Sequence, residues 1–324
     1  MEFIHSILAH DETVAVGTVV SYDLPVNPLS HTLITLKYAQ DLVSENMPFV
    51  KALDMMTKIE VLYKGSAVFS MSGFDAFACG ILVNGFESWS MNEEGNDDDE
   101  RSITILVPHT RKLYSPDECY PRTTRGELIL QITYATAFTS IDTVFAQIET
   151  VEIPNAAPGQ FIKMTTLART PSAAGQLDIE LPIGNEISEL VMWGETIPVA
   201  AADLATIEKM EILIDNINHF YSEANIETIH NMAGRMFAAP GYHGYHVHRL
   251  TAAAFAQWDD TSMAIPADHV ISNHLHLPFD IFRDGNYALQ TLGKSDVIVR
   301  IDAGDTGAIR VIPVEIVTSG MGAV

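Results

Sequence analysis

The pattern of the hexapeptide Glu127-Leu128-Ile129-Leu130-Gln131-Ile132 recurs later in the chain as Asp296-Val297-Ile298-Val299-Arg300-Ile301. In both segments every second residue is a branched aliphatic residue, which is typical of a β-strand that buries one face. Short strands of this kind resemble one another easily by chance. The pair therefore decides the fold only because the segments around it recur in the same way.

Five further segments of the first half recur in the second half in the same order. They are Asp23-Leu24-Pro25-Val26 with Glu180-Leu181-Pro182-Ile183; Lys58-Ile59-Glu60-Val61-Leu62 with Lys209-Met210-Glu211-Ile212-Leu213; the helical stripe Phe74, Phe77, Ala78, Ile81 and Leu82 with Ile226, Ile229, Met232, Ala233 and Met236; Leu106-Val107-Pro108 with His276-Leu277-Pro278; and Val151-Glu152-Ile153 with Val314-Glu315-Ile316. The separations run from 151 to 170 residues, close to half of the 324-residue chain. This ordered recurrence predicts a duplicated domain.

The seam between the two copies is Pro154–Gln160, a stretch of small and structure-breaking residues. We therefore expect a first domain over residues 1–155, with an N-terminal arm over about residues 1–13, and a second domain over residues 160–324. Each half holds about eight strand candidates and one short helix, which predicts two tandem eight-stranded jelly-roll β-sandwiches in an all-β protein. Alternating runs at 14–20, 34–38 and 177–181 are among these candidates. Other eight-stranded sandwiches fit the pattern as well.

The charge is strongly acidic, with 42 Asp and Glu against 18 Lys and Arg, a net charge of −24. Such a chain repels phosphates, so we expect no direct binding of nucleic acid. The apolar fraction of 47% is ample for two packed cores. Cys79 and Cys119 are too few for a disulfide framework or a Cys-rich zinc site, which predicts two thiols. We expect neither a signal peptide nor a membrane-spanning segment, because the basic and long apolar stretches that they need are missing.

A tandem pair of jelly rolls resembles the double jelly-roll major capsid proteins of tailless icosahedral viruses of bacteria and archaea, which often contain an internal membrane. The resemblance runs from about Val14 to Val317. The Leu-Pro-Val and Leu-Pro-Ile pieces at Leu24 and Leu181 look like an early strand of those proteins. The segment Leu277–Asn286 and the strands after it look like their C-terminal barrel.

This resemblance implies a structural protein, not an enzyme. It implies pseudo-hexagonal homotrimers that tile an icosahedral shell, and a location in the virion after synthesis in the host cytoplasm. The implied partners are further copies of the chain, minor capsid or vertex proteins and, in some viruses, an internal membrane. It implies no catalytic residue, no cofactor and no metal ligand.

Histidines argue for a different interpretation, because six of the twelve lie close together: His243, His246, His248, His269, His274 and His276. In a strand, His246 and His248 share one face, as do His274 and His276, and two His-X-His pairs of this kind suit a metal. A metal-dependent bicupin, also a duplicated β-barrel, needs a carboxylate soon after its His-X-His. Residues 249–253 supply none, and the first half has no His-X-His. We therefore expect interface or loop histidines, with the bicupin as the third interpretation.

Three further features carry open alternatives. The acidic run Glu93–Glu100 is typical of a solvated loop, although clustered carboxylates also suit calcium. Trp89, Trp193 and Trp258 are expected in the core, but stacking on sugars would make a two-domain carbohydrate-binding or carbohydrate-active β-sandwich, the second interpretation. Phe3, Ile4, Ile7 and Leu8 fit one side of a short N-terminal helix, expected as a tail that packs on a neighbouring subunit, with contact with lipid as the alternative.

Overall fold

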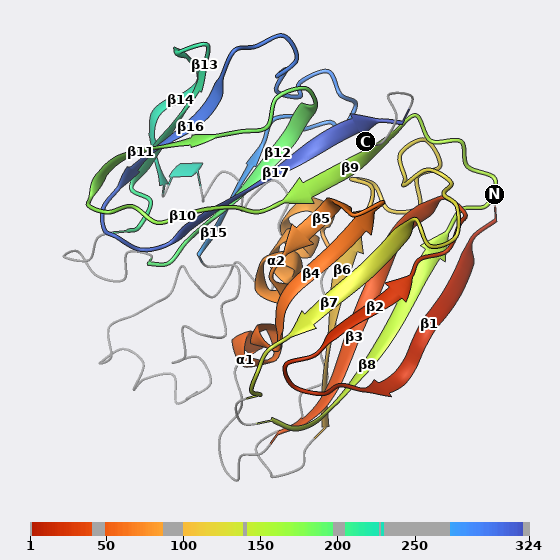
Figure 1. Cartoon of the computed structure of the whole chain (residues 1–324). Helices are drawn as coiled ribbons and strands as arrows, with labels where there is room; N and C mark the ends of the chain where they lie inside the picture. Colours follow the sequence, from red (N-terminus) through yellow and green to blue (C-terminus); the bar gives the residue numbers. More distant parts are fainter. Residues whose placement is uncertain are drawn as a thin grey trace, which may run out of the picture. The chain divides into compact units, whose positions relative to one another are not determined.

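The computed structural model describes residues 2–40, 49–86, 100–138, 141–196, 205–226, 228–229 and 273–319. These residues form two compact units, named roll 1 and roll 2. Roll 1 contains the described residues from Glu2 to Ile162, and roll 2 contains the described residues from Lys163 to Val317. Both are built mainly from antiparallel strands (Figure 1). None of the described helices is long and apolar enough to cross a membrane.

Roll 1 consists of two four-stranded arrays with two helices. Its elements are β1 (Ile4–Thr13), β2 (Val19–Asp23), β3 (Leu29–Gln40), α1 (Phe49–Asp54), β4 (Met56–Tyr63), β5 (Ser66–Met71), α2 (Gly73–Asn84), β6 (Glu100–Pro108), β7 (Leu128–Tyr134) and β8 (Ile141–Glu152). One array has the order β1-β8-β3-β6 and the other the order β5-β4-β7-β2.

Roll 2 repeats this arrangement. Its elements are β9 (Gln160–Thr165), β10 (Leu167–Arg169), β11 (Gly175–Glu180), β12 (Glu186–Gly194), β13 (Lys209–Ile214), β14 (Ile217–Asn225), β15 (His274–Pro278), β16 (Val297–Ala303) and β17 (Ile309–Thr318). One array has the order β15-β12-β17, with β10 and the Lys163–Thr165 part of β9 beside β17. The other has the order β11-β16-β13-β14.

The connectivity of the two rolls is the same. When the strands of each roll are counted from one to eight, with β9 and β10 together as the first strand of roll 2, both rolls have two orders: one-eight-three-six and two-seven-four-five. Strands that pass to and fro between two sheets in this way form a jelly roll, which limits exposed edges. The predicted all-β fold of two tandem jelly rolls is confirmed.

The repeated segments of the sequence also pair in the same register. In roll 1, β4 lies against β7 so that Val61 is opposite Leu130. In roll 2, β13 lies against β16 so that Ile212 is opposite Val299. A slip of one residue in either roll would turn the buried side chains outward, so this agreement is a strict test of the duplication.

The hairpin turns repeat as well. Lys64 and Gly65 connect β4 to β5, and Asp215 and Asn216 connect β13 to β14; all four residues have positive φ angles, between 49° and 85°. Two-residue turns with two positive φ angles match the right-handed twist of paired strands. The amide of the first turn residue donates a hydrogen bond to the carbonyl of the residue before the seventh strand of its roll, from Lys64 to Glu127 before β7 at 2.8 Å and from Asp215 to Asp296 before β16 at 3.1 Å.

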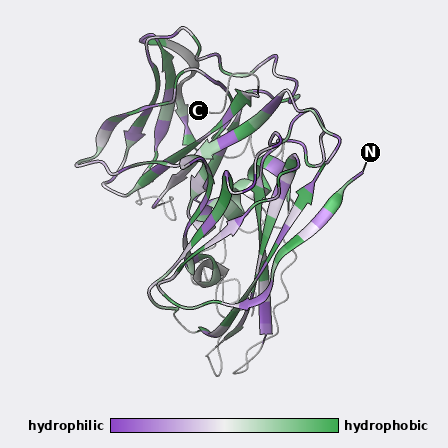
Figure 2. Ribbon diagram, turned by 45° about the vertical axis from the view of Figure 1, so that its right-hand side comes forward, coloured by the Kyte–Doolittle hydropathy of each residue, from purple (hydrophilic) through white to green (hydrophobic). Residues whose placement is uncertain are grey.

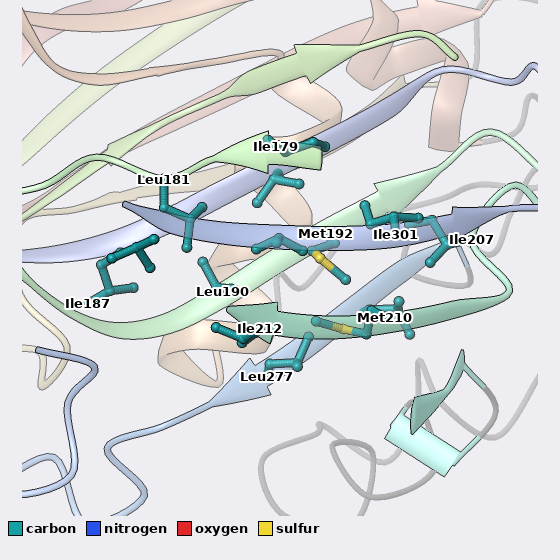
Figure 3. Packing of buried hydrophobic residues seen from close by; sticks show 14 of the residues in the cluster. Ile179, Leu181, Ile187, Leu190, Met192, Ile207, Met210, Ile212, Leu277 and Ile301 are labelled. Atoms are coloured by element: carbon teal, nitrogen blue, oxygen red, sulfur yellow. The ribbon is translucent and has the colours of Figure 1, made fainter. Parts of the chain in front are cut away.

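Each roll buries its own apolar faces. β7 and β16 show an identical alternation of buried and half-buried residues along seven positions, and Figure 2 shows hydrophobic and hydrophilic residues mixed along the strands of both rolls. In roll 2 the side chains of both arrays meet in one cluster that includes Met192, Ile212, Leu277 and Ile301 (Figure 3). Each such side chain contributes about 1.5–3 kcal/mol by leaving water.

Helix α2 confirms the first predicted helical stripe. Ser72 caps its start by accepting a hydrogen bond from the amide of Asp75 at 3.1 Å. Gly85 ends it with a φ of 65° and donates to the carbonyl of Ile81 at 2.9 Å. The second predicted stripe lies mostly outside the described residues, although Ile229 is buried in the core of roll 2.

Two local predictions were wrong. The expected N-terminal helix is instead strand β1, which pairs along β8 and leaves Phe3, Ile4 and Ile7 exposed. A helix this short gains little on its own, whereas a neighbouring strand satisfies its backbone groups over ten residues. The run 14–20, expected as a strand, turns at Gly17 with a φ of 67°, and only its last two residues belong to β2. The division at residues 155–160 stays a prediction.

Candidate functional site

Of the clustered histidines, two are on described strand β15 and four lie outside the described residues: His243, His246, His248 and His269. His274 is opposite Trp193 and His276 is opposite Val191, while Leu275 between them belongs to the core. The predicted common face of His274 and His276 is therefore confirmed.

The environment of His276 is that of a buried structural hydrogen bond. Its Nε2 lies 2.6 Å from Oε2 of Glu189, and both side chains are buried. Arg283 approaches the other carboxylate oxygen at 3.9 Å. Among the described residues no group of three or more His, Cys, Asp or Glu side chains is arranged to hold a metal ion. The expectation of no metal, cofactor or catalytic site stays a prediction.

Of the residues behind the sugar-stacking and calcium-binding alternatives, the structure describes only Trp193 and Glu100. The guanidinium of Arg310 lies 3.4 Å from the centre of the Trp193 ring, so a cation already covers one face of the ring. Trp89, Trp258 and residues 93–99 lie outside the described residues, and Glu100 is the exposed first residue of β6.

Both predicted thiols are confirmed as buried cysteines. Burial first, and then the charges of Glu118 and Asp117, raise the pKa of Cys119 to about 12. This thiol therefore stays protonated near neutral pH and is a weak nucleophile.

Roll 1 buries two histidines beside the loop that follows β6. His31 on β3 shares a hydrogen bond with Oγ of Ser30 at 2.9 Å, and the amide of His109 donates to the Ser30 carbonyl at 3.0 Å. Burial, with a smaller effect of His5, lowers the pKa of His31 to about 4. Burial, with a smaller effect of His31, lowers the pKa of His109 to about 3. Both imidazoles are therefore neutral near neutral pH.

A buried ion pair lies in the same loop. Nη2 of Arg111 is 2.7 Å from Oε2 of Glu118, and both side chains are almost fully buried. Gln160 adds a hydrogen bond of 3.1 Å to the same carboxylate oxygen. Both charges are thus compensated, as burial requires.

Each roll also holds a buried glutamate on its last strand by an asparagine. Asn27 donates to Oε2 of Glu152 at 2.7 Å, and Asn185 donates to Oε2 of Glu315 at 2.7 Å. Glu152 and Glu315 are the central residues of a repeated sequence segment, so this Asn–Glu clamp is part of the duplication. The sequence comparison missed the asparagines because Gly184, one extra residue, shifts Asn185 out of step with the repeated Leu-Pro segment.

One loop of roll 2 exposes large apolar side chains although hydrogen bonds hold it in place. Between β15 and β16, Ile281, Phe282, Tyr287 and Leu292 are exposed, with Phe282 and Leu292 at 67% and 68%. Asp280 anchors the loop by accepting the amide of Gly285 at 2.7 Å. We name these four residues the loop patch. An ordered apolar surface of this kind is typical of a protein contact.

The chain matches no protein-family model and no curated protein. Among solved structures, it is similar to viral capsid proteins over nearly its full length. The major capsid protein of Sulfolobus Turreted Icosahedral Virus covers 100% of both chains with a TM-score of 0.67 and 11% identity. The major capsid protein P2 from Bacteriophage PM2 covers 97% of this chain and 98% of its own, with a TM-score of 0.61 and 12% identity. The similarity to the PBCV-1 protein VP54 covers 99% of this chain and 96% of VP54, with a TM-score of 0.61 and 11% identity.

The fold is the double jelly roll of these capsid proteins. At 11 to 12% identity the likeness establishes the architecture. The two rolls share their strand register but differ at the positions of His31, on β3, and His109, which follows β6. The equivalent positions in roll 2 are Glu189, opposite Pro278 as His31 is opposite Pro108, and Phe279.

Proposed function

We propose that this protein is a structural major capsid protein, without enzymatic activity, that assembles as homotrimers into an icosahedral viral shell. Its two rolls, divided near residues 155–160, would give each trimer six similar barrels and hence a pseudo-hexagonal outline. The protein would be made in the host cytoplasm and act in the virion. Minor capsid or vertex proteins, and an internal membrane where one is present, complete the set of proposed partners.

One observation carries this proposal: the double jelly roll extends over the whole chain and matches capsid proteins of three viruses from end to end. The likeness covers 96 to 100% of the compared capsid proteins and 97 to 100% of this chain, which supports a shared architecture over the compared length.

The surface properties agree with self-assembly better than with binding to nucleic acid. A net charge of −24 repels phosphates, and copies of so acidic a chain need apolar contacts to come together. The loop patch offers such a contact on roll 2. In roll 1 the exposed rings of Phe3 and Tyr114, 5.1 Å apart, offer a second one.

The test is the mass of the purified protein in solution, followed by electron microscopy at assembly concentrations. Multi-angle light scattering should give a trimer of about 107 kDa, three times the chain mass of 35.6 kDa. Micrographs should show hexagonal capsomers or closed shells. A protein that remains monomeric at high concentration contradicts the proposal.

A matched pair of variants tests the loop patch. Phe282→Ser with Leu292→Ser should lower the yield of assembled particles, because both side chains lose an apolar contact. Val19→Ser on β2 removes an apolar side chain that is 56% exposed and should leave assembly unchanged. Equal yields from both variants would remove the patch from the assembly contacts.

A further inference from the structure

The clamp of roll 2 places an amine and a carboxamide on the two oxygens of one buried carboxylate. Asn185 donates its Nδ2 to Oε2 of Glu315 at 2.7 Å. The Nζ of Lys163 lies 3.1 Å from Oε1. No hydrogen bond to Oε1 is formed by the described residues, so the ammonium of Lys163 is the counter-charge of this oxygen. The side chain of Glu315 is 2% exposed and that of Lys163 is 31% exposed, so the carboxylate end of the contact is shielded from solvent while the amine is partly accessible.

Three separate elements hold the three groups in place. Lys163 is on β9, Asn185 is in the turn before β12, and Glu315 is on β17, where it pairs with Ile187 of β12. The carbonyl of Asn185 also accepts a hydrogen bond from the hydroxyl of Thr291. Fixed placement of two reacting groups replaces the improbable encounter that a free amine and a free amide would need.

The chemistry of these groups is complementary. A neutral lysine amine is a nucleophile, and the carbon of an asparagine carboxamide is an electrophile with a poor leaving group. Departure of Nδ2 requires a proton, and attack by Nζ releases one. A carboxylate in contact with both nitrogens can carry protons from the first to the second.

We propose that Lys163 and Asn185 become joined by a side-chain amide bond, with Glu315 as the proton carrier. Lys163 gives a proton to Oε1 of Glu315, and its neutral Nζ attacks Cγ of Asn185. The tetrahedral adduct passes protons through Glu315 to Nδ2, the bond between Cγ and Nδ2 breaks, and ammonia leaves. One carbon–nitrogen bond forms and one breaks. The lysine ammonium and the asparagine carboxamide become an amide and an ammonium ion, and Glu315 returns to its carboxylate form.

Roll 1 provides an internal comparison. Its clamp has the same 2.7 Å contact between Asn27 and Glu152, but the group at Oε1 of Glu152 is the hydroxyl of Ser6. The amine is therefore what distinguishes the clamp of roll 2. The cross-link would tie the first strand of roll 2 to the loop before its third strand and restrain unfolding of that roll.

Mass spectrometry of the intact protein tests the cross-link, independently of whether the protein forms a shell. The purified chain should be lighter than its sequence mass by one ammonia, after allowance for removal of Met1. Proteolysis should release one branched peptide that contains both Lys163 and Asn185. A chain with its full sequence mass overturns the proposal.

Substitutions separate this reaction from other losses of ammonia, since the Asn84-Gly85 sequence is prone to succinimide formation with the same mass change. Lys163→Arg keeps the positive charge beside Glu315 but removes the amine, and Glu315→Gln removes the proton carrier; both should restore the full mass. Asn27→Ala, the matched change in roll 1, should leave the ammonia loss in place. Circular dichroism checks that each variant is folded. An ammonia loss that persists in folded Lys163→Arg overturns the proposal.

Discussion

Acidification from about pH 7 to about pH 5 is expected to destabilise roll 1 through His31 and His109. Both are buried and neutral in the folded protein, with pKa values lowered from 6.5 to about 4 and about 3. The unfolded chain exposes both imidazoles, so it binds protons first as the pH falls. Because the pKa of each histidine is lower in the folded protein than in the unfolded chain, its contribution to stability is fully present above the unfolded-state pKa of 6.5. That contribution is lost as the pH falls from 6.5 toward the folded-state pKa.

The size of the effect follows from these pKa values. One pKa unit corresponds to about 1.4 kcal/mol. A pH of 5 is about 1.5 units below the pKa of an imidazole in the unfolded chain, whereas the folded imidazoles are still mostly neutral at that pH. Each histidine therefore lowers the free energy of unfolding by about 2 kcal/mol. The two together remove about 4 kcal/mol, a large share of the 5–15 kcal/mol that is typical of a folded domain.

Urea unfolding at the two pH values measures the loss, and hydrogen exchange of β3 and β6 assigns it to roll 1. The variant His109→Phe uses the residue that roll 2 carries at the equivalent position, Phe279. It should reduce the pH-dependent loss to about 2 kcal/mol. His10→Gln is the control, since the His10 side chain is 71% exposed, and it should behave as the unmodified protein does.

The comparison between variants is decisive because protonation of the many carboxylates is common to all of them. If His109→Phe loses as much stability as the unmodified protein between the two pH values, the buried imidazole is not the cause. Unchanged stability of the unmodified chain at pH 5 would refute the argument for both histidines.

Three further changes test the packing, the buried charge and the helix end. Leu130→Ala should lower the free energy of unfolding by about 3 kcal/mol, because it leaves a cavity in roll 1. Ile217→Ala, at a side chain that is 71% exposed, should change the free energy of unfolding by less than about 0.5 kcal/mol. Equal effects of the two changes would contradict the assigned core. Arg111→Met leaves the buried carboxylate of Glu118 without the guanidinium that compensates its charge, and should lower the free energy of urea unfolding by about 3–5 kcal/mol. Adding Glu118→Leu should recover most of this loss. A double variant without recovery would refute the pairing. Gly85→Ala forces a side chain into a φ of 65° and should cost about 1 kcal/mol in thermal unfolding, and a neutral effect would argue against the left-handed helix end.

The jelly-roll repeat was predictable because its signals are local and periodic. Leu128, Leu130 and Ile132 alternate in β7 as Val297, Val299 and Ile301 do in β16, and a period of two needs no knowledge of distant residues. The common face of His274 and His276 follows from the same period. By contrast, the apolar residues near the N-terminus gave the wrong structure, because β8, which makes them a strand, is more than a hundred residues away.

The site was less predictable than the fold, because its properties depend on what surrounds each side chain. The residues that neighbour His31 and His109 in the sequence do not distinguish a buried histidine from an exposed one. The burial that lowers the pKa values of both imidazoles comes from tertiary packing. The Asn185–Glu315 contact joins residues 130 positions apart. Single-residue insertions in loops hide such contacts from a comparison of the two halves.

The amino-acid order alone determined that this chain forms two similar all-β halves, because alternation of apolar residues and its ordered recurrence are properties of neighbouring residues. Tertiary structure decided which strand pairs with which, which imidazoles and carboxylates are buried, and that Lys163, Asn185 and Glu315 meet. Those outcomes depend on the free energy of removing specific groups from water against specific distant partners, and no local stretch of sequence contains that information.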